Sequence, residues 1–195
     1  GMRVPLIIAG EPVRQPGELN RAFAWATDIT PTILALSGTA LPGERYAGRP
    51  VLPLIGRDLT PLLRGEVERV YGEDDAVGYE LTGHGALFQG DYKVVVNQAP
   101  LGDGQWRLFN IVEDPGETVD LAATQPALFQ RMLSRYQQYQ QENGVLPLPV
   151  GYTQMRQLFF NTLHKKSGEQ ILIFLLTLLL LLPFYVAYRM KKDVV

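Results

Sequence analysis

The sequence predicts an α+β fold: an antiparallel sheet of about four strands packs against one long helix, and a single membrane-spanning helix follows. Three observations support this prediction. Short runs in residues 70–110 have a period of two, residues 128–139 hold an apolar stripe at helical spacing, and residues 171–188 contain no charge. The first two patterns describe a folded head, and the third describes an anchor.

The first apolar run, residues 4–9, is apolar at consecutive positions instead of at alternate ones. This pattern is typical of a strand that is buried on both faces of a sheet. A strand of that kind needs neighbours on both sides, and few segments near it look able to provide them. We therefore expect the chain to begin inside a larger fold.

A helix is predicted after a loop rich in proline and glycine. Asp28 or Thr30 would cap it, Pro31 would occupy its first turn, and Gly38 would end it. Residues 39–66 are again rich in proline and glycine, which indicates an ordered but irregular connection. The helix would place three apolar side chains on one face: Ile29, Ile33 and Leu36.

The sheet and its helix occupy the middle of the chain. Gly90 and Asp91 form a two-residue hairpin signal, and the four predicted strands are residues 77–81, 86–89, 92–96 and 106–110. Thr124 would cap the following helix, Pro126 would lie in its first turn, and Gly144 would end it. Its apolar stripe should pack on the sheet and consists of Leu128, Phe129, Met132, Leu133, Tyr136 and Tyr139.

Residues 151–195 indicate contact with lipid. Residues 151–170 form a short segment with an apolar face and basic flanks, which predicts a helix at the membrane interface. Residues 171–188 would make a helix of roughly 27 Å, close to the ~30 Å core of a bilayer. A buried core helix would usually keep a polar stripe, whereas Thr177 is the only polar side chain before Tyr185. Residues 189–195 form a basic tail.

Charge and composition exclude several classes of function. Residues 1–150 contain twelve Lys and Arg against eighteen Asp and Glu, a balance of −6, whereas residues 151–195 have a balance of +4. An acidic head argues against nucleic acid as a partner, because phosphate binding needs a basic surface. The chain contains no cysteine, so disulfides, thiolate metal sites and cysteine nucleophiles are excluded.

No catalytic, cofactor-binding or metal-binding residue is predicted from motifs. His84 and His164 lie in unrelated settings, and no phosphate loop, HExxH or GxSxG pattern occurs. The acidic run of Glu73, Asp74 and Asp75 suggests a divalent cation or a solvated loop. The solvated loop is favoured, since no glycine-punctuated series of ligands surrounds the run.

Several blocks, in order, resemble the arylsulfatases, members of the alkaline phosphatase superfamily. Residues 1–5 (G-M-R-V-P) are similar to a segment that follows an active-site lysine in these enzymes. The other blocks are residues 28–34 (D-I-T-P-T-I-L) with Gly38, 78–83 (G-Y-E-L-T-G), 86–93 (A-L-F-Q-G-D-Y-K), 106–110 (W-R-L-F-N), 114–117 (D-P-G-E) and 120–122 (D-L-A).

This resemblance covers roughly residues 1–150 and corresponds to the C-terminal part of the family. It implies that residues 1–66 are a strand-helix remnant of a sulfatase-type α/β domain and that residues 67–150 are the C-terminal subdomain. The family's chemistry lies in an N-terminal domain, where a Cys or Ser in a [CS]-x-P-x-R motif becomes formylglycine and calcium is bound. Ser37, Ser134 and Ser167 lack the following Pro and Arg, so no catalytic or calcium-binding role is transferred to any residue.

Two functions remain open. The chain is expected to be the C-terminal part of a membrane-anchored arylsulfatase-like protein, without the catalytic half and inactive alone. Alternatively, it is a non-catalytic structural or accessory subunit of a membrane complex, derived from a sulfatase. In both cases we expect another polypeptide to cover residues 4–36, calcium to be confined to the absent half, and lipid to surround the single-pass anchor. The positive charges hardly decide the orientation, and the resemblance favours a periplasmic or lumenal head.

Overall fold

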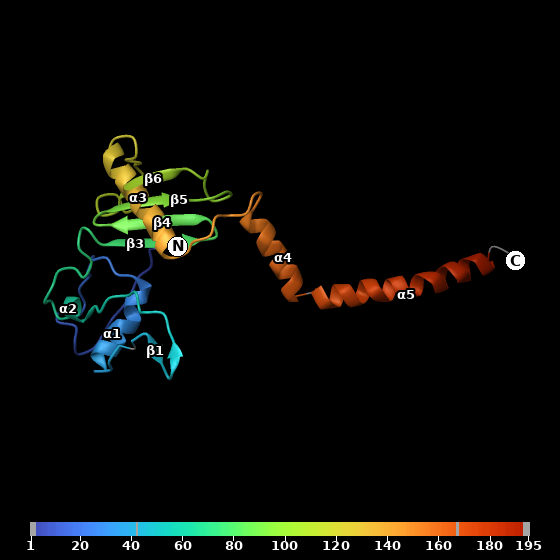
Figure 1. Ribbon diagram of the computed structural model, residues 1–195, viewed down its shortest axis with the longest axis horizontal. Helices are drawn as coiled ribbons and strands as arrows, with labels where there is room; N and C mark the ends of the chain where they lie inside the picture. Colours follow the sequence, from blue (N-terminus) through green and yellow to red (C-terminus); the bar gives the residue numbers. More distant parts are fainter. Residues whose placement is uncertain (1–2, 42, 167, 193–195) are drawn as a thin grey trace. The chain divides into compact units, whose positions relative to one another are not determined.

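The computed structural model describes residues 3–41, 43–166 and 168–192 (Figure 1). Parts of two predicted segments lie outside the described residues: Gly1 and Met2 of the G-M-R-V-P block and residues 193–195 of the basic tail, together with Ser167. The chain divides into two compact units. The first comprises Gly1–Val77, Leu87–Lys93 and Phe109–Val119, and the second comprises Gly78–Ala86, Val94–Leu108 and Asp120–Val195.

The predicted four-stranded antiparallel sheet is confirmed. Its strands are β3 (Ala76–Leu81), β4 (His84–Gln89), β5 (Tyr92–Val96) and β6 (Trp106–Asn110), and their order in the sheet follows the chain. Thr82 and Gly83, with φ of 53° and 87°, connect β3 to β4, and positive φ at both positions is what a tight two-residue hairpin requires. Gly90 has φ of 55° in the turn between β4 and β5, where the sequence predicts a hairpin.

The first unit contains the predicted helix α1 (Ile29–Leu36), preceded by a short 3-10 turn, η1 (Ala26–Asp28). Pro31 lies buried in the first turn of α1, and Gly38 follows its end with φ of 65°. Asp28 is the N-cap residue of α1, one of the two predicted, but its side chain makes no capping hydrogen bond to α1; it accepts instead from the backbone N–H of Trp25, the N-cap of η1. The remaining elements of the unit are β1 (Arg45–Tyr46), β2 (Arg49–Pro50) and α2 (Thr60–Leu63).

The strand predicted for residues 4–9 is not formed in the described chain, and most of these residues are exposed. A strand exists only when a neighbouring strand satisfies its backbone N–H and C=O groups. None of the described residues pairs with this segment, so it stays extended without a ladder. The run is apolar as predicted, but an apolar sequence does not form a strand without a second strand beside it.

The second unit is built around α3 (Pro126–Glu142), which lies across the strands (Figure 1). The ring of Tyr136 lies 4.7 Å from that of Trp106 on β6, and Met132 is buried beside it. Gly85 allows this close approach, since a Cβ there would lie 2.2 Å from the Tyr136 hydroxyl. The predicted cap is displaced: α3 begins after Gln125, whereas the Thr124 hydroxyl donates to the Leu121 carbonyl instead.

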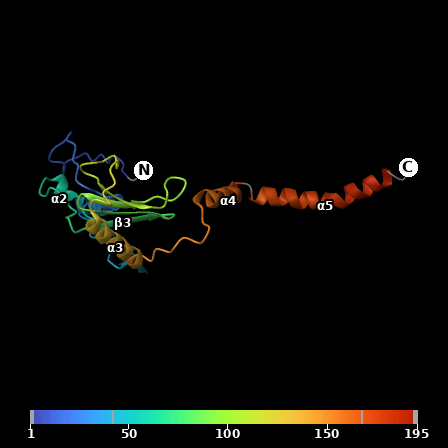
Figure 2. The ribbon, with the colours of Figure 1, turned by 90° about the horizontal axis from the view of Figure 1, so that it is seen from above.

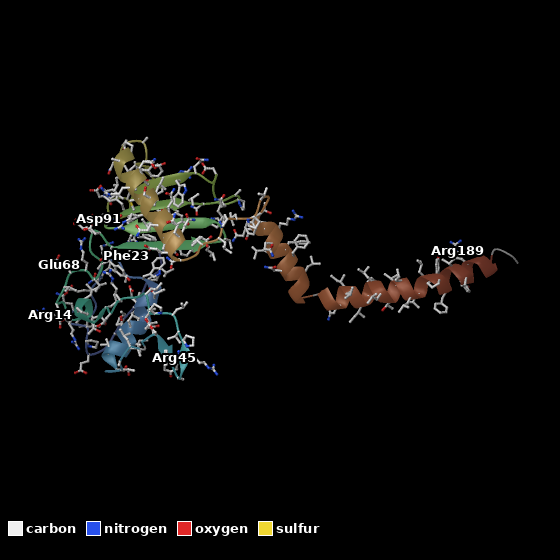
Figure 3. All side chains as sticks on the ribbon, in the orientation of Figure 1. Arg14, Phe23, Arg45, Glu68, Asp91 and Arg189 are labelled. Atoms are coloured by element: carbon white, nitrogen blue, oxygen red, sulfur yellow. The ribbon has the colours of Figure 1, made fainter. Side chains whose placement is uncertain are left out.

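Two further helices follow, α4 (Gln154–Lys166) and α5 (Gly168–Lys192) (Figure 2). Within α5, Gln170–Arg189 has a mean hydropathy of 2.6, and its side chains project into open space (Figure 3). By length and composition this helix can cross a bilayer. Pro183 lies inside it, and the Thr177 hydroxyl donates to the Ile173 carbonyl, so the one polar side chain of residues 171–184 is satisfied within the helix.

Candidate functional site

A buried carboxylate organises the first unit. Asp28 has no exposed surface, and both of its oxygens accept hydrogen bonds. Oδ2 accepts from the Trp25 backbone N–H at 2.6 Å, and Oδ1 accepts from the Arg57 backbone N–H at 2.8 Å and from the Tyr71 hydroxyl at 2.5 Å. Because a buried charge is tolerated only when it is hydrogen-bonded, these three donors are what allow the carboxylate to remain inside. Asp28 thus joins three parts of the unit at the start of α1.

An ion pair extends this carboxylate cluster. The guanidinium of Arg57 donates to both oxygens of Asp75, at 2.6 and 2.5 Å, and to the Val70 carbonyl at 2.7 Å. It also lies 4.5 Å from the centre of the Tyr71 ring. The hydrogen bond from Arg57 lowers the pKa of Asp75, and burial, followed by the bond to Asp28, raises the pKa of Tyr71. Tyr71 therefore stays a neutral donor, which suits a structural clamp better than an acid–base catalyst.

The acidic run of Glu73, Asp74 and Asp75 lies in a loop just before β3. Glu73 and Asp74 are exposed, while Asp75 is held by Arg57 and by the Gly72 backbone N–H. Within residues 3–41, 43–166 and 168–192, no three His, Cys, Asp or Glu side chains gather in a way that could hold a metal ion. The carboxylate of Asp75 closes this loop through its bonds to Arg57 and Gly72.

Two of the sequence blocks meet at a buried lysine. Lys93, which ends the block 86–93, is only 4% exposed and forms an ion pair with Glu117 of the block 114–117. Its ammonium group also lies 5.6 Å from the centre of the Phe88 ring. The turn that presents Glu117 is held by Asp114, whose carboxylate accepts from the backbone N–H groups of two later residues. The ion pair thus serves to join two segments.

The histidines and serines singled out in the sequence are not brought together. His84 accepts from the Gln98 backbone N–H through Nδ1, at 3.2 Å, so its proton is on Nε2, which faces the Gln154 amide oxygen. Ser37, which follows α1, donates to the Leu34 carbonyl of that helix, and Ser134 donates to the Gln130 carbonyl within α3; the side chain of His164 lies outside the described residues. The described part of the chain therefore shows no serine beside a histidine base.

An apolar groove lies in the first unit, and we call it the α1 groove. It has a volume of about 280 Å³. Ile7 is 89% exposed and Ile33 59% exposed along its walls, whereas Leu59 is buried at its floor. The walls and floor are formed by Leu6, Ile7, Ile8, Ala9, Ile29, Thr32, Ile33, Leu36 and Leu59. Residues 6–9 thus lie beside the apolar face of α1. For both segments the sequence predicts apolar surface that another polypeptide covers.

Sequence reasoning missed the Asp28 cluster. Arg57 and Tyr71 lie 29 and 43 residues from Asp28, and nothing local indicates that they bind one carboxylate. The only available signal was the position of Asp28 at the head of the block 28–34. A capping residue and a tertiary acceptor use the same oxygen lone pairs, so the sequence alone could not separate the two roles.

Comparison with known proteins finds curated sulfatases that are similar to this chain, although no family model matches it. The chain is 30% identical over 150 residues to an uncharacterized sulfatase of Schizosaccharomyces pombe, a match that covers 76% of this chain and 27% of that protein. It is also 36% identical over 69 residues to the steryl-sulfatase of Mus musculus, over 35% of this chain and 10% of that protein. The chain therefore spans about a quarter or less of these relatives.

Solved structures give weaker matches. The crystal structure of Ps i-CgsB is 24% identical, with a TM-score of 0.42 over 57% of this chain and 23% of that one. A Bacteroides thetaiotaomicron protein from work on glycosaminoglycan metabolism is 17% identical, with a TM-score of 0.44 over 58% of this chain and 24% of that one. The curated relatives carry the assignment: this chain contains a C-terminal region of the arylsulfatase family.

Proposed function

We propose that this chain is the C-terminal part of a membrane-anchored arylsulfatase-like protein and that it does not hydrolyse sulfate esters by itself. One observation carries the proposal: the identity to a sulfatase extends over 150 residues but covers only 27% of that protein. By the resemblance, the formylglycine and calcium positions of the family belong to another part of the fold. The catalytic half, with its calcium, would then be formed by residues other than these 195.

The residues present support this division of labour. The chain has no cysteine to convert, and its most buried carboxylate, Asp28, already accepts three hydrogen bonds. The hydroxyls of Ser37 and Ser134 donate to the carbonyls of Leu34 in α1 and Gln130 in α3. Without an activated nucleophile, these residues alone are not expected to attack the sulfate ester.

The α1 groove is where we propose that the catalytic half docks. Burial of a Leu or Ile side chain is worth roughly 1.5–3 kcal/mol, so several exposed ones in a single groove favour association with another polypeptide. Residues 6–9 also present unpaired backbone, which a strand of the partner could satisfy. Both features belong to residues 4–36, the part of the chain for which the sequence predicts a partner.

Site-specific photo-crosslinking in native membranes tests this docking. A photoreactive amino acid at Ile7 or at Ile33 should give one dominant cross-linked polypeptide, identified by mass spectrometry as a sulfatase catalytic half. Leu52 is the matched control, because it is apolar and 91% exposed but does not line the groove. Equal cross-linking from Leu52, or a stable chain with no cross-links from Ile7 and Ile33, would refute the docking.

A second candidate function is favoured by α5. A fully exposed apolar helix of this length would also suit a structural or accessory subunit of a membrane complex. The same cross-linking separates the two functions, because a partner without sulfatase motifs would identify the accessory subunit. We propose a periplasmic or lumenal head in either case. Because the chain has no cysteine, a single introduced one reports the orientation of the head. Tyr46→Cys should react with a membrane-impermeant maleimide on intact cells, or on sealed vesicles whose lumenal side faces outward.

A further inference from the structure

The second unit contains a pocket of about 420 Å³ that none of the features above uses, and we call it the α3 pocket. It lies between the C-terminal half of α3, one end of the strands and residues 145–148. This volume is within the range of small-molecule sites, at its lower end. Its lining consists of Glu80, Gly83, Val96, Gln98, Gly104, Trp106, Leu133, Tyr136, Gln137, Gln140, Val145, Leu146, Pro147 and Leu148.

The polar groups of the lining are neutral donors and acceptors that the protein leaves open. The carboxamides of Gln98, Gln137 and Gln140 make no hydrogen bond to any described residue. Tyr136 is only 4% exposed, and its hydroxyl likewise has no hydrogen-bond partner in the described part of the chain. Burial raises the pKa of Tyr136 to about 12, so the hydroxyl keeps its proton. Each carboxamide offers two N–H donors and one oxygen acceptor, which matches a ligand with several hydroxyl groups.

The charge of the lining selects against anions. Glu80 is its one ionisable side chain besides Tyr136, and its Oε1 accepts from the Gly83 backbone N–H at 2.8 Å. The lining contains no Lys, Arg or His. A sulfate or carboxylate brought into the pocket would face a like charge and find no cation to replace its water. A neutral ligand avoids both costs.

The rest of the lining is apolar and suits the C–H face of a ring. Trp106 and Leu133 form one part of it, and Val145, Pro147 and Leu148 another. Leu148 packs directly over Gly83, since a Cβ on Gly83 would lie 2.3 Å from its Cδ1. Open carboxamides, a buried hydroxyl and an aromatic wall thus surround the same space.

We propose that the α3 pocket binds a neutral sugar ring. Its hydroxyls pair with the carboxamides of Gln98, Gln137 and Gln140, and its C–H face packs on Trp106. The proposal goes beyond the sulfatase-like role, because the site prefers the uncharged part of a glycan to a sulfated one. It holds whether or not a catalytic half exists.

Binding of defined disaccharides to the full chain tests the proposal. The protein is kept in a zwitterionic detergent, because sugar-based detergents would compete, and saturation-transfer NMR and calorimetry are recorded with lactose, N,N′-diacetylchitobiose and a monosulfated lactose. At least one neutral disaccharide should bind, and the monosulfated lactose should bind at least tenfold more weakly than lactose. Gln140→Ala and Gln137→Ala should each weaken binding about tenfold while the thermal unfolding midpoint is kept.

Gln138→Ala is the matched control. Gln138 lies on the same helix but does not line the pocket; its amide N–H donates to Glu142 and its oxygen accepts from Arg135. Its substitution should leave the affinity unchanged. The proposal is overturned if neither neutral disaccharide binds, if the sulfated one binds equally well, or if Gln138→Ala weakens binding as much as Gln140→Ala. These results do not depend on sulfatase activity, so they cannot be confused with a failure of the proposed function.

Discussion

Replacement of Asp28 by alanine is expected to destabilise the first unit severely. The change removes the acceptor of three hydrogen bonds, those from the Trp25 N–H, the Arg57 N–H and the Tyr71 hydroxyl, and leaves three donors without a partner in a site with no exposed surface. A hydrogen bond to a charged group contributes about 1.5–3 kcal/mol, and such contributions are not additive. A buried donor left without a partner costs about 1–3 kcal/mol, so for three such donors we expect the free energy of unfolding to fall by about 3–5 kcal/mol.

Two further variants divide this loss. Asp28→Asn keeps an acceptor oxygen but presents an N–H₂ group to one of the donors, so it should cost about 2–3 kcal/mol. Tyr71→Phe removes one donor and leaves the carboxylate with two, which should cost about 1–2 kcal/mol. Asp28→Asn and Tyr71→Phe both affect the hydrogen bond between these two side chains. The double variant should therefore lose less stability than the sum of the two single losses.

Urea unfolding of the full chain, followed by tryptophan fluorescence, measures these differences. Trp25 is a suitable probe, because its backbone N–H donates to Asp28. Asp74→Ala is the control: it removes an exposed carboxylate of the same unit and should change stability by less than about 0.5 kcal/mol. The reasoning fails if Asp28→Ala costs less than about 1 kcal/mol, or if the losses in the double variant simply add.

Three other outcomes are expected. The purified chain should show no hydrolysis of an aryl sulfate, because it contains no formylglycine precursor; turnover by homogeneous protein, with host sulfatases excluded by mass spectrometry, would contradict this. Replacing Leu176 and Leu179 together by Arg should release the head from membranes, since each central charge costs roughly 2.5–3.5 kcal/mol on insertion; retention of the double variant through an alkaline carbonate wash would argue against a span. Stability should also fall as pH rises above about 10, because Tyr136 ionises there in the unfolded chain whereas burial raises its folded pKa to about 12. Tyr136→Phe should flatten this alkaline loss relative to Tyr46→Phe, which changes an exposed tyrosine, and equal pH profiles of the two variants would refute the assignment.

Much of the fold follows from local patterns. The period of two in residues 77–110 and the hairpin at Gly90 were sufficient to predict four strands, because strand periodicity and turn geometry depend on neighbouring residues only. The helix from Pro126 to the residues before Gly144 and the exposed apolar helix α5 were predicted for the same reason. The arylsulfatase resemblance also rests on short local blocks, so the amino-acid sequence is sufficient to recognise it.

The tertiary structure decided the features that depend on distant partners. Asp28 looked like a helix cap, but folding brings it to donors 29 and 43 residues away, and three hydrogen bonds to a buried charge outweigh one exposed capping bond. Residues 4–9 have the composition of a strand, yet a strand needs a neighbour, and the described chain provides none. The α3 pocket arises only when α3, the ends of the strands and residues 145–148 come together. Apolar patterns determine which residues become buried, whereas hydrogen-bond partners and cavities depend on how distant segments meet.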